Sequence, residues 1–353
     1  MKKNKKRVDY IILGQGLAGS LLAYSLMERG QSVHLFDNHH QGASSKVAAG
    51  LMNPITGRRF VKSWMIDDLF PFAVKTYRAI EKEFGVEIYK EREILRALFS
   101  VKEENSWDER SGIDSYAPYM NSSPVTNGIE AIVQAPFSWG GLRAAGQVDV
   151  PKLLQVFQNH FREKGMLEEE PFQYDALVSD KNGVQYKSIH AKKIIFCEGH
   201  QARFNPWFSA LPFVPSKGEM LEIKLPDHEL TSIVKHKSYI APLAGKTYWV
   251  GSTYEWDDLS ENPSEKGREL LLNSLNKMMA VPYEVVNHLA AIRPTVKDRR
   301  PFIGAHPDNK SLLIFNGLGT KGTSLGPYWA SAFCDYILDG KALEVEVDVA
   351  RYF

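Results

Sequence analysis

The order of apolar and polar residues near the start of the chain predicts a strand, a helix and a second strand. Residues 8–13 form a short, β-rich apolar run that leads directly into Gly14. Residues 20–29 carry apolar side chains at helical spacing, and Gly30 follows as a helix-ending residue. Residues 32–36 are apolar again and end at an acid. The opening therefore predicts the order strand, glycine loop, helix, strand, acid.

The same patterns continue along the chain. Helices are predicted for residues 67–84, 150–165, 264–279 and 326–338. Buried strands are predicted for residues 191–196, 220–223, 248–250 and 312–315. Residues 85–136 show only scattered strand-like runs and polar turns, which indicate an inserted segment. This order favours an α/β fold, a Rossmann-type nucleotide-binding domain joined to a β-rich α+β domain.

A chain of 353 residues exceeds what one hydrophobic core usually serves, so two domains are expected. We expect the nucleotide-binding domain to be discontinuous and to comprise residues 1–84, 140–210 and 291–353. Residues 85–139 and 211–290 are then expected to form the substrate domain.

Composition and charge narrow the class of protein. Hydrophobic residues make up 44% and charged residues 24% of the chain, which is typical of folded globular proteins. A net charge of +1 gives no basic field, so we expect no nucleic-acid partner. No apolar stretch approaches the roughly 20 residues of a membrane span. Two cysteines provide no disulfide framework, and we expect a cytoplasmic protein with a solvated basic tail at Lys2, Lys3, Lys5, Lys6 and Arg7.

Three glycines after the first predicted strand have the spacing of a dinucleotide-binding loop. Gly14 would allow the tight turn, Gly16 the approach of a pyrophosphate, and Gly19 close helix–strand packing. The helix that follows would direct backbone N–H groups at phosphate oxygens. Asp37, at the end of the second strand, is placed to bind ribose hydroxyls. The pattern predicts a dinucleotide but does not choose between NAD and FAD.

Several further segments resemble those of one family of flavoproteins. They are Gly42 to Pro54, Gly146 to Asp149, Lys217 to Glu219, Tyr239 to Pro242, Val250 to Thr253, Arg293 to Asp298, Pro301 to Gly304, and the glycine loop Gly317 to Gly322. Together they resemble the D-amino-acid oxidase family, particularly its glycine-oxidase-like and sarcosine-oxidase-like branch. The resemblance spans nearly the whole chain and implies FAD as the cofactor.

The resemblance also implies which residues contact the cofactor. Besides the first glycine loop and its acid, the expected cofactor-binding residues are Ser44, Ser45, Ala49, Gly50, Leu51, Gly199, Gly319, Thr320, Lys321, Gly322 and Thr323. Sarcosine-oxidase-like relatives attach the flavin covalently through a cysteine. The corresponding stretch of this chain holds no cysteine, so noncovalent FAD is expected. Cys197 and Cys334 are expected to be buried packing residues. The histidines show no metal-binding spacing, and we expect no metal site.

In the family, an arginine and a tyrosine hold the substrate carboxylate, and they correspond to Arg293 and Tyr239 here. A guanidinium matches the two oxygens of a carboxylate, and a tyrosine hydroxyl adds a third hydrogen bond. Two positions depart from the family pattern, because Thr320 and Leu243 stand where arginines are often found. Lys321 would either replace that charge near the flavin or point to solvent.

The expected activity is FAD-dependent oxidation of the C–N bond in a small amino acid or secondary amine that carries a carboxylate. Hydride would pass to flavin N5, and O2 or another electron acceptor would reoxidise the flavin. Two alternatives stay open. One is the same chemistry on the wobble uridine of tRNA, because the Ala49-Gly50 loop and the stretch Gly140 to Arg143 resemble the flavin domain of a bifunctional tRNA-modifying enzyme. The other is flavin binding without turnover. The basic pair Arg58 and Arg59 would face either the substrate or solvent.

Overall fold

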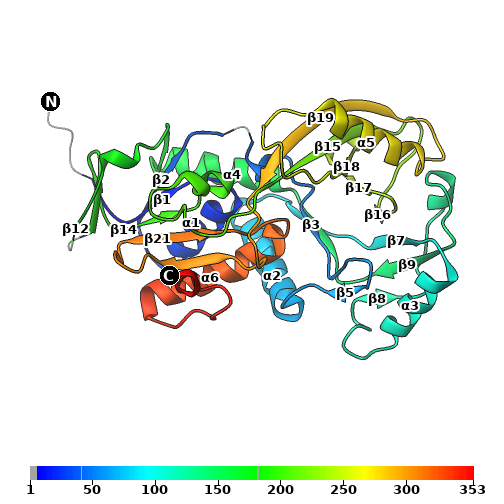
Figure 1. Cartoon of the computed structure of the whole chain (residues 1–353), viewed down its shortest axis with the longest axis horizontal. Coiled ribbons are helices and arrows are strands. Elements are labelled where there is room, and N and C mark those ends of the chain that lie inside the picture. Colours follow the sequence, from blue (N-terminus) through cyan, green and yellow to red (C-terminus); the bar gives the residue numbers. More distant parts are fainter. Residues whose placement is uncertain (1–5, 41, 181–182) are drawn as a thin grey trace. The chain divides into compact units, whose positions relative to one another are not determined.

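The computed structural model of the chain describes residues 6–40, 42–180 and 183–353, and it divides into two compact units. The first unit comprises Met1–Lys46, Val150–Ser216 and Ile292–Phe353, and the second comprises Val47–Asp149 and Lys217–Ala291. Each unit is discontinuous in sequence, as the colours of Figure 1 show. Residues 47–84 and 140–149 were expected in the nucleotide-binding domain, but they belong to the second unit. Their apolar side chains explain this, because Ile66 shares a core with Trp107 and Leu142.

The first unit is built on an eight-stranded sheet whose centre is parallel. Its central strands, in spatial order, are β2 (Val33–Asp37), β1 (Lys6–Leu13), β14 (Ile189–Phe196) and β21 (Leu312–Asn316). The outer strands are β11 (Leu167–Glu169), β12 (Leu177–Asp180), β13 (Gly183–Tyr186) and β20 (Phe302–Ala305). Because the central strands are parallel, their carboxyl ends meet at one edge of the sheet, where α/β proteins bind ligands.

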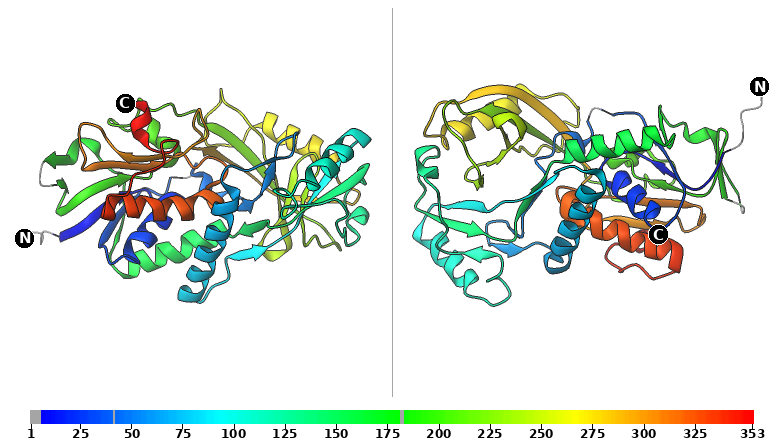
Figure 2. Two further views of the ribbon diagram at one scale, coloured as in Figure 1. Left: turned by 90° about the horizontal axis from the view of Figure 1, so that it is seen from below. Right: turned by 180° about the vertical axis from the view of Figure 1, so that it is seen from behind.

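Three helices lie side by side across one face of this sheet: α4 (Val150–Glu163), α1 (Leu17–Met27) and α6 (Gly322–Asp339) (Figure 2). A Cβ atom at Gly326 would lie 2.7 Å from Leu21 Cδ1, so glycine permits the close packing of α6 on α1. The other face is covered by an apolar cluster that includes Phe36, Phe196 and Phe302. Short 3-10 helices complete the unit: η1 (Ser44–Lys46), η3 (Tyr174–Ala176), η4 (Gly199–Phe204) and η6 (Val349–Tyr352).

The second unit contains a second eight-stranded sheet. Its order is β19 (Glu284–Arg293), β15 (Ser216–Lys224), β18 (Thr247–Gly251), β17 (Tyr239–Pro242), β16 (Ile233–Lys235), β7 (Ile94–Leu98), β9 (Ser138–Leu142) and β8 (Met120–Asn121). One face packs against α5 (Glu265–Asn276) through Leu271 and Leu275. The opposite face packs against a separate apolar cluster that includes Phe60 and Trp107.

Smaller elements surround this sheet. They are the strands β3 (Leu51–Met52), β10 (Gly146–Val148) and β6 (Tyr89–Glu91), the hairpin β4 (Ile55–Thr56) and β5 (Val61–Lys62), the helices α2 (Ile66–Phe84) and α3 (Val101–Ser111), and the 3-10 helices η2 (Ile129–Ala131) and η5 (Ala244–Lys246). None of the helices among the described residues is both long and apolar enough to cross a membrane.

The predicted elements are present, with shifted ends. Helices α1 and α6 begin at Leu17 and Gly322, earlier than predicted, because both start inside the glycine loops. The sequence did not predict α3, in which only Trp107 is buried, or β19, whose first half is largely exposed. Of the expected basic tail, Lys6 and Arg7 belong to β1, and Lys2, Lys3 and Lys5 lie outside the described residues.

A buried ionic network anchors one edge of the second unit. Lys217 Nζ lies 2.6 Å from Asp258 Oδ2 and 3.7 Å from Glu219 Oε1, and the lysine side chain is fully buried. Glu219 also accepts hydrogen bonds from the backbone N–H and the hydroxyl of Ser264. Ser264 in turn caps α5 by accepting from Gly267 N at 3.0 Å. Glu219 therefore helps Asp258 to compensate the charge of Lys217 and also fixes the start of α5.

Replacing Glu219 by alanine should destabilise the protein by on the order of 3 kcal/mol, because it leaves a buried lysine partly uncompensated. Urea unfolding measures this change. The matched control is Glu222→Ala on the same strand, where a partly exposed carboxylate accepts from Asn287 Nδ2 and should matter by less than about 1 kcal/mol. Equal effects of the two substitutions would show that the network does not stabilise the fold.

Candidate active site

At two positions of the first loop another backbone segment lies so close that only glycine fits. Gly14 has φ of +103°, and a Cβ atom there would lie 2.5 Å from the carbonyl oxygen of Cys197. A Cβ atom at Gly19 would lie 1.8 Å from the carbonyl oxygen of Gly14. No side chain fits either position, so the sequence pattern reflects the tight turn from β1 into α1.

Gly16 is a glycine for a different reason. Its φ of −72° is accessible to any residue, and the nearest heavy atom to a Cβ there is Ser45 Oγ, at 3.6 Å. Gly16 is also the N-cap of α1 and brings no capping side chain of its own, and Leu17 N donates to Ser45 Oγ at 3.2 Å. Open space beside the positive end of a helix fits a phosphate group. Of the two predicted serines of η1, Ser45 therefore adjoins this loop.

Asp37 is fixed at the end of β2, beside the glycine loop. Its Oδ2 accepts from the backbone N–H of Gln15 at 2.6 Å, and its Oδ1 accepts from His39 N at 2.7 Å. Gln15 Nε2 donates to the carbonyl oxygen of Leu154 in α4, which holds the loop in place. The carboxylate retains further lone pairs, so it fits the predicted role with ribose hydroxyls.

The predicted cofactor-binding residues Ala49, Gly50 and Leu51 belong to the second unit. A Cβ atom at Gly50 would lie 1.8 Å from the carbonyl oxygen of Val148, and its φ is +69°. Leu51 pairs with Gln147, whose Nε2 donates to the carbonyl oxygen of Ala49 at 3.0 Å. Packing against β10 therefore explains this glycine, and contact of the segment with FAD stays a prediction.

The ends of β14 and β21 are tied together by a residue that the sequence did not point to. The buried Asn316 donates from Nδ2 to the carbonyl oxygen of Gly199 at 2.9 Å and accepts from Gly317 N at 2.7 Å. Gly199 and Gly317 both have positive φ. A buried polar residue at the end of an apolar strand, before a glycine, was the available signal.

The C-terminal glycine loop lies at the same edge of the first unit. A Cβ atom at Gly322 would lie 3.0 Å from Leu17 Cδ2, so the start of α6 adjoins the start of α1. Thr323 is buried and Thr320 is exposed. Burial lowers the pKa of Lys321 to about 8, and the charges of Arg299 and Arg300 add to this effect. Lys321 is therefore partly withdrawn from solvent.

The two predicted carboxylate-binding residues lie in different units. Arg293 ends β19 in the first unit, is 9% exposed, and donates from Nη1 to Ser216 Oγ at 3.5 Å. Tyr239 lies on β17 in the second unit, where its hydroxyl accepts from Asn53 Nδ2 at 2.8 Å. Burial raises the pKa of Tyr239. Their action on one shared carboxylate stays a prediction.

Glu198 is a further, partly buried acid at this edge that the sequence did not point to. It follows β14 and accepts hydrogen bonds from the hydroxyl of Tyr174 and from Asn205 Nδ2. Burial raises the pKa of Glu198 to about 7, although both hydrogen bonds act to lower it. The carboxyl group is thus poised to change protonation state near neutral pH.

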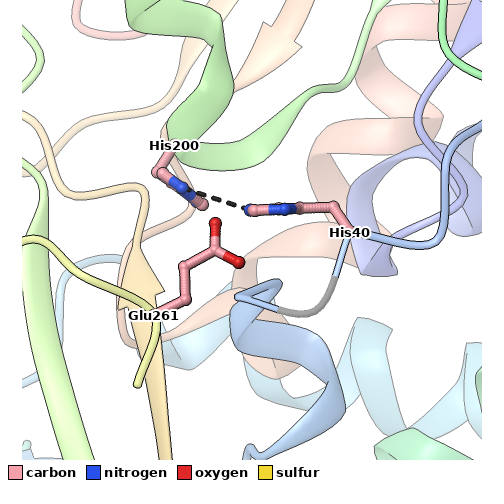
Figure 3. A group of neighbouring side chains, drawn as sticks. All are labelled: His40, His200 and Glu261. Carbon is pink, nitrogen blue, oxygen red and sulfur yellow. Dashed lines mark hydrogen bonds between the residues drawn. The ribbon is translucent and has the colours of Figure 1, made fainter. Parts of the chain in front are cut away.

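Two histidines also meet in the first unit. The Nε2 atoms of His40 and His200 are 3.2 Å apart (Figure 3). Gln201 Nε2 lies within hydrogen-bonding distance of both. Burial and the neighbouring charges of His40 and Arg203 lower the pKa of His200 to about 3. His200 therefore serves as a neutral hydrogen-bonding group beside His40.

The geometry of the first unit defines a Rossmann-type dinucleotide-binding protein, with its glycine loop, helix start and acid in the expected places. The chain belongs to the FAD dependent oxidoreductase (DAO) family, whose model matches residues 9–336. It is 23% identical to glycine oxidase of Bacillus subtilis (strain 168), over 95% of this chain and 94% of that protein. These findings confirm the family that the sequence resembles and FAD as its cofactor.

Solved structures show the same fold. Glycine oxidase from Geobacillus kaustophilus superposes with a TM-score of 0.79 at 22% identity, covering 98% of both chains. Iminodiacetate oxidase from Chelativorans sp. BNC1 gives a TM-score of 0.77 at 20% identity, covering 97% of this chain and 98% of that one. The likeness confirms the predicted α/β architecture with its β-rich second part.

Substituting alanine at Gly16 tests where the phosphates bind. The variant should fold with unchanged thermal stability, because a Cβ atom has room there, yet bind FAD about tenfold or more weakly, because the methyl group occupies the phosphate position. Fluorescence titration of the apoprotein with FAD measures the affinity. Gly19→Ala is the control, since it should impair both folding and binding. Undiminished FAD affinity of Gly16→Ala would place the phosphates elsewhere.

Glu198 should make stability depend on pH. Its pKa is about 7 in the folded protein against 4.5 ordinarily, so its stabilising contribution is complete below pH 4.5 and is lost as pH rises through 7. The loss is on the order of 3 kcal/mol. In urea unfolding between pH 5 and 8, a Glu198→Gln variant should lack this decline. An exposed Glu109→Gln variant controls for lost charge, and a parallel decline in both variants would contradict the assignment.

Proposed function

We propose that this protein oxidises the C–N bond of a small amino acid or secondary amine that carries a carboxylate, using noncovalently bound FAD. The observation that carries the proposal is the place of Arg293 in the first unit. It is buried two residues before Thr295, whose Cγ2 is 3.4 Å from a Cβ position at Gly319 in the C-terminal glycine loop. Arg293 thus lies two residues from a contact with the C-terminal glycine loop, which is predicted to bind the cofactor.

Arg293 and Tyr239 would bind and orient the substrate. The guanidinium offers parallel N–H donors to the two carboxylate oxygens. Asn53 donates to the oxygen of Tyr239, which leaves the O–H proton available for the substrate. Because burial raises the tyrosine pKa, the hydroxyl stays protonated at neutral pH and acts as a donor.

Bound FAD would supply the acceptor, flavin N5, for the hydride that leaves the substrate α-carbon. With the carboxylate held at two points, the α-hydrogen is oriented without a side-chain base, and such positioning contributes several kcal/mol. The imine product would hydrolyse in water, and O2 or another electron acceptor would regenerate the oxidised cofactor. Backbone N–H groups at the start of α6, together with Lys321, would favour negative charge nearby.

Noncovalent attachment is supported by the state of the two cysteines. Cys197 and Cys334 are both buried. Burial raises the pKa of Cys197 well above its ordinary value and that of Cys334 to about 12. Neither sulfur is therefore available as the thiolate that covalent attachment needs.

The relatives support two candidate substrate classes. The glycine oxidases and the iminodiacetate oxidase are named for small amino acids or amines with carboxylates, which favours the first class. The chain is also 22% identical to the tRNA 5-methylaminomethyl-2-thiouridine biosynthesis bifunctional protein MnmC of Marinobacter nauticus and spans 54% of that protein. The net charge of +1 favours the small molecule.

The deciding experiment follows the flavin absorbance near 450 nm anaerobically while glycine, sarcosine, proline, iminodiacetate and D-amino acids are added. Bleaching by one of them would establish the reaction class. With that substrate, Arg293→Ala should raise KM by about 100-fold or more, and Tyr239→Phe by about tenfold, since a charged and a neutral hydrogen bond are lost. An unchanged KM would remove Arg293 from the role, and bleaching by tRNA alone would favour the second class.

A further inference from the structure

Three polar residues form a row across one face of the sheet in the second unit. Tyr239 on β17 is directly paired with Lys235 on β16, and Lys235 is paired with Arg96 on β7. Paired residues project from the same face, and neighbouring strands are about 4.8 Å apart. The lysine and the arginine therefore lie one and two strands away from the tyrosine that is proposed to hold the substrate carboxylate.

The nearest residues to this row on β7, β16 and β17 that project from the same face are apolar. Ile94 and Leu98 flank Arg96 on β7, Ile233 precedes Lys235, and Ala241 follows Tyr239, all within one hydrophobic cluster. The row ends at glycine on both sides, and tryptophans fill the space. A Cβ atom at Gly140 would lie 2.3 Å from Trp107 Cε2, and one at Gly251 would lie 2.8 Å from Trp249 Cη2. The two cations thus stand in a predominantly apolar setting.

The two cations contact carbonyl oxygens and aromatic rings. Arg96 Nη2 donates to the carbonyl oxygen of Gly57 at 3.1 Å, and its guanidinium lies 4.7 Å from the centre of the Phe60 ring. Lys235 Nζ donates to the carbonyl oxygen of Lys237 at 3.3 Å and lies 4.7 Å from the centre of the Tyr239 ring. Within the part of the chain that the structure describes, neither forms an ion pair with a carboxylate.

This arrangement is unfavourable without a ligand. Burial lowers the pKa of Arg96, and burial together with the neighbouring Arg96 charge lowers that of Lys235 to about 8. Glu103 raises the pKa of Arg96 electrostatically, but its Oε2 accepts from the backbone N–H of Phe99. Two adjacent, partly buried cations repel each other, and a bound anion would relieve the cost of both.

We propose that Arg96 and Lys235 bind a second acidic group of the substrate, so that the preferred amine carries two carboxylates. The inference rests on the proposed function, in which Tyr239 and Arg293 hold the first carboxylate. Lys235 and Arg96 lie about 5 and 10 Å from Tyr239 across the strands, which suits carboxylates separated by a few bonds. The proposal also explains why arginine is not needed at positions 320 and 243, because Arg96 on β7 and Lys235 on β16 supply positive charge instead.

The experiment compares two probes without an amine, glutarate and valerate, which have five carbons each and two or one carboxylates. Isothermal titration calorimetry of the FAD-loaded protein should give a Kd about tenfold or more lower for glutarate, because the second carboxylate gains charge-assisted hydrogen bonds. Arg96→Gln and Lys235→Gln should each remove most of this preference while changing the valerate Kd by less than about threefold. Arg96→Lys should restore part of it.

Lys237→Gln is the matched control, because Lys237 is exposed two residues from Lys235 and should leave the glutarate preference unchanged. Retained flavin content and circular dichroism show that each variant is folded. The proposal is overturned if the unaltered protein does not prefer glutarate, if both glutamine variants keep the preference, or if Arg96→Gln weakens both probes equally. That last result would place Arg96 at the first carboxylate.

The result is distinguishable from a failure of the proposed function. If small monocarboxylate amines bleach the flavin but glutarate is not preferred, the second site is wrong and the proposed reaction stands. If glutarate is preferred and lost in both glutamine variants, but no amine bleaches the flavin, the dicarboxylate site stands and the proposed reaction is wrong.

Discussion

The first unit depends on three backbone segments approaching so closely that side chains are excluded. A Cβ atom at Gly19 would overlap the carbonyl oxygen of Gly14, and one at Gly14 would overlap that of Cys197. These contacts fix the turn from β1 into α1 against the end of β14. The direction of the helix start, the open space at Gly16 and the position of Asp37 all follow from them. The geometry of the predicted cofactor site is therefore a consequence of backbone packing.

The sequence predicted the first unit well because its signals are local. A glycine loop between an apolar strand and an amphipathic helix needs no distant partner to be recognised. The sequence was less informative where structure depends on distant contacts. Helix α3 is mostly polar and owes its place to the single buried Trp107, which fits under Gly140. The domain boundary was misplaced for residues 47–84, because their core partners come from much later in the chain.

The candidate site shows the same division. Gly14, Gly16, Gly19 and Asp37 were predicted from spacing, and Arg293 and Tyr239 from family resemblance. Asn316, Glu198 and the row of Arg96 and Lys235 could not, because each acquires its meaning from strand pairing or burial. Arg96 and Lys235 are 139 positions apart in sequence yet paired in the sheet. A single basic residue in a strand does not indicate a binding site until its neighbours in the sheet are known.

Two lysines of the same sheet differ in the groups that compensate their charge. Lys217 on β15 is fully buried, and it is matched by Asp258 and Glu219, so the network is complete without a ligand. Lys235 on β16 is withdrawn from water beside a second cation, and its partners are a carbonyl oxygen and an aromatic ring. Such partners stabilise a cation less than a carboxylate does. Among the described residues, Lys217 is paired with two carboxylates and the partly buried Lys235 with none, so Lys235 is the lysine that we propose binds an acidic ligand.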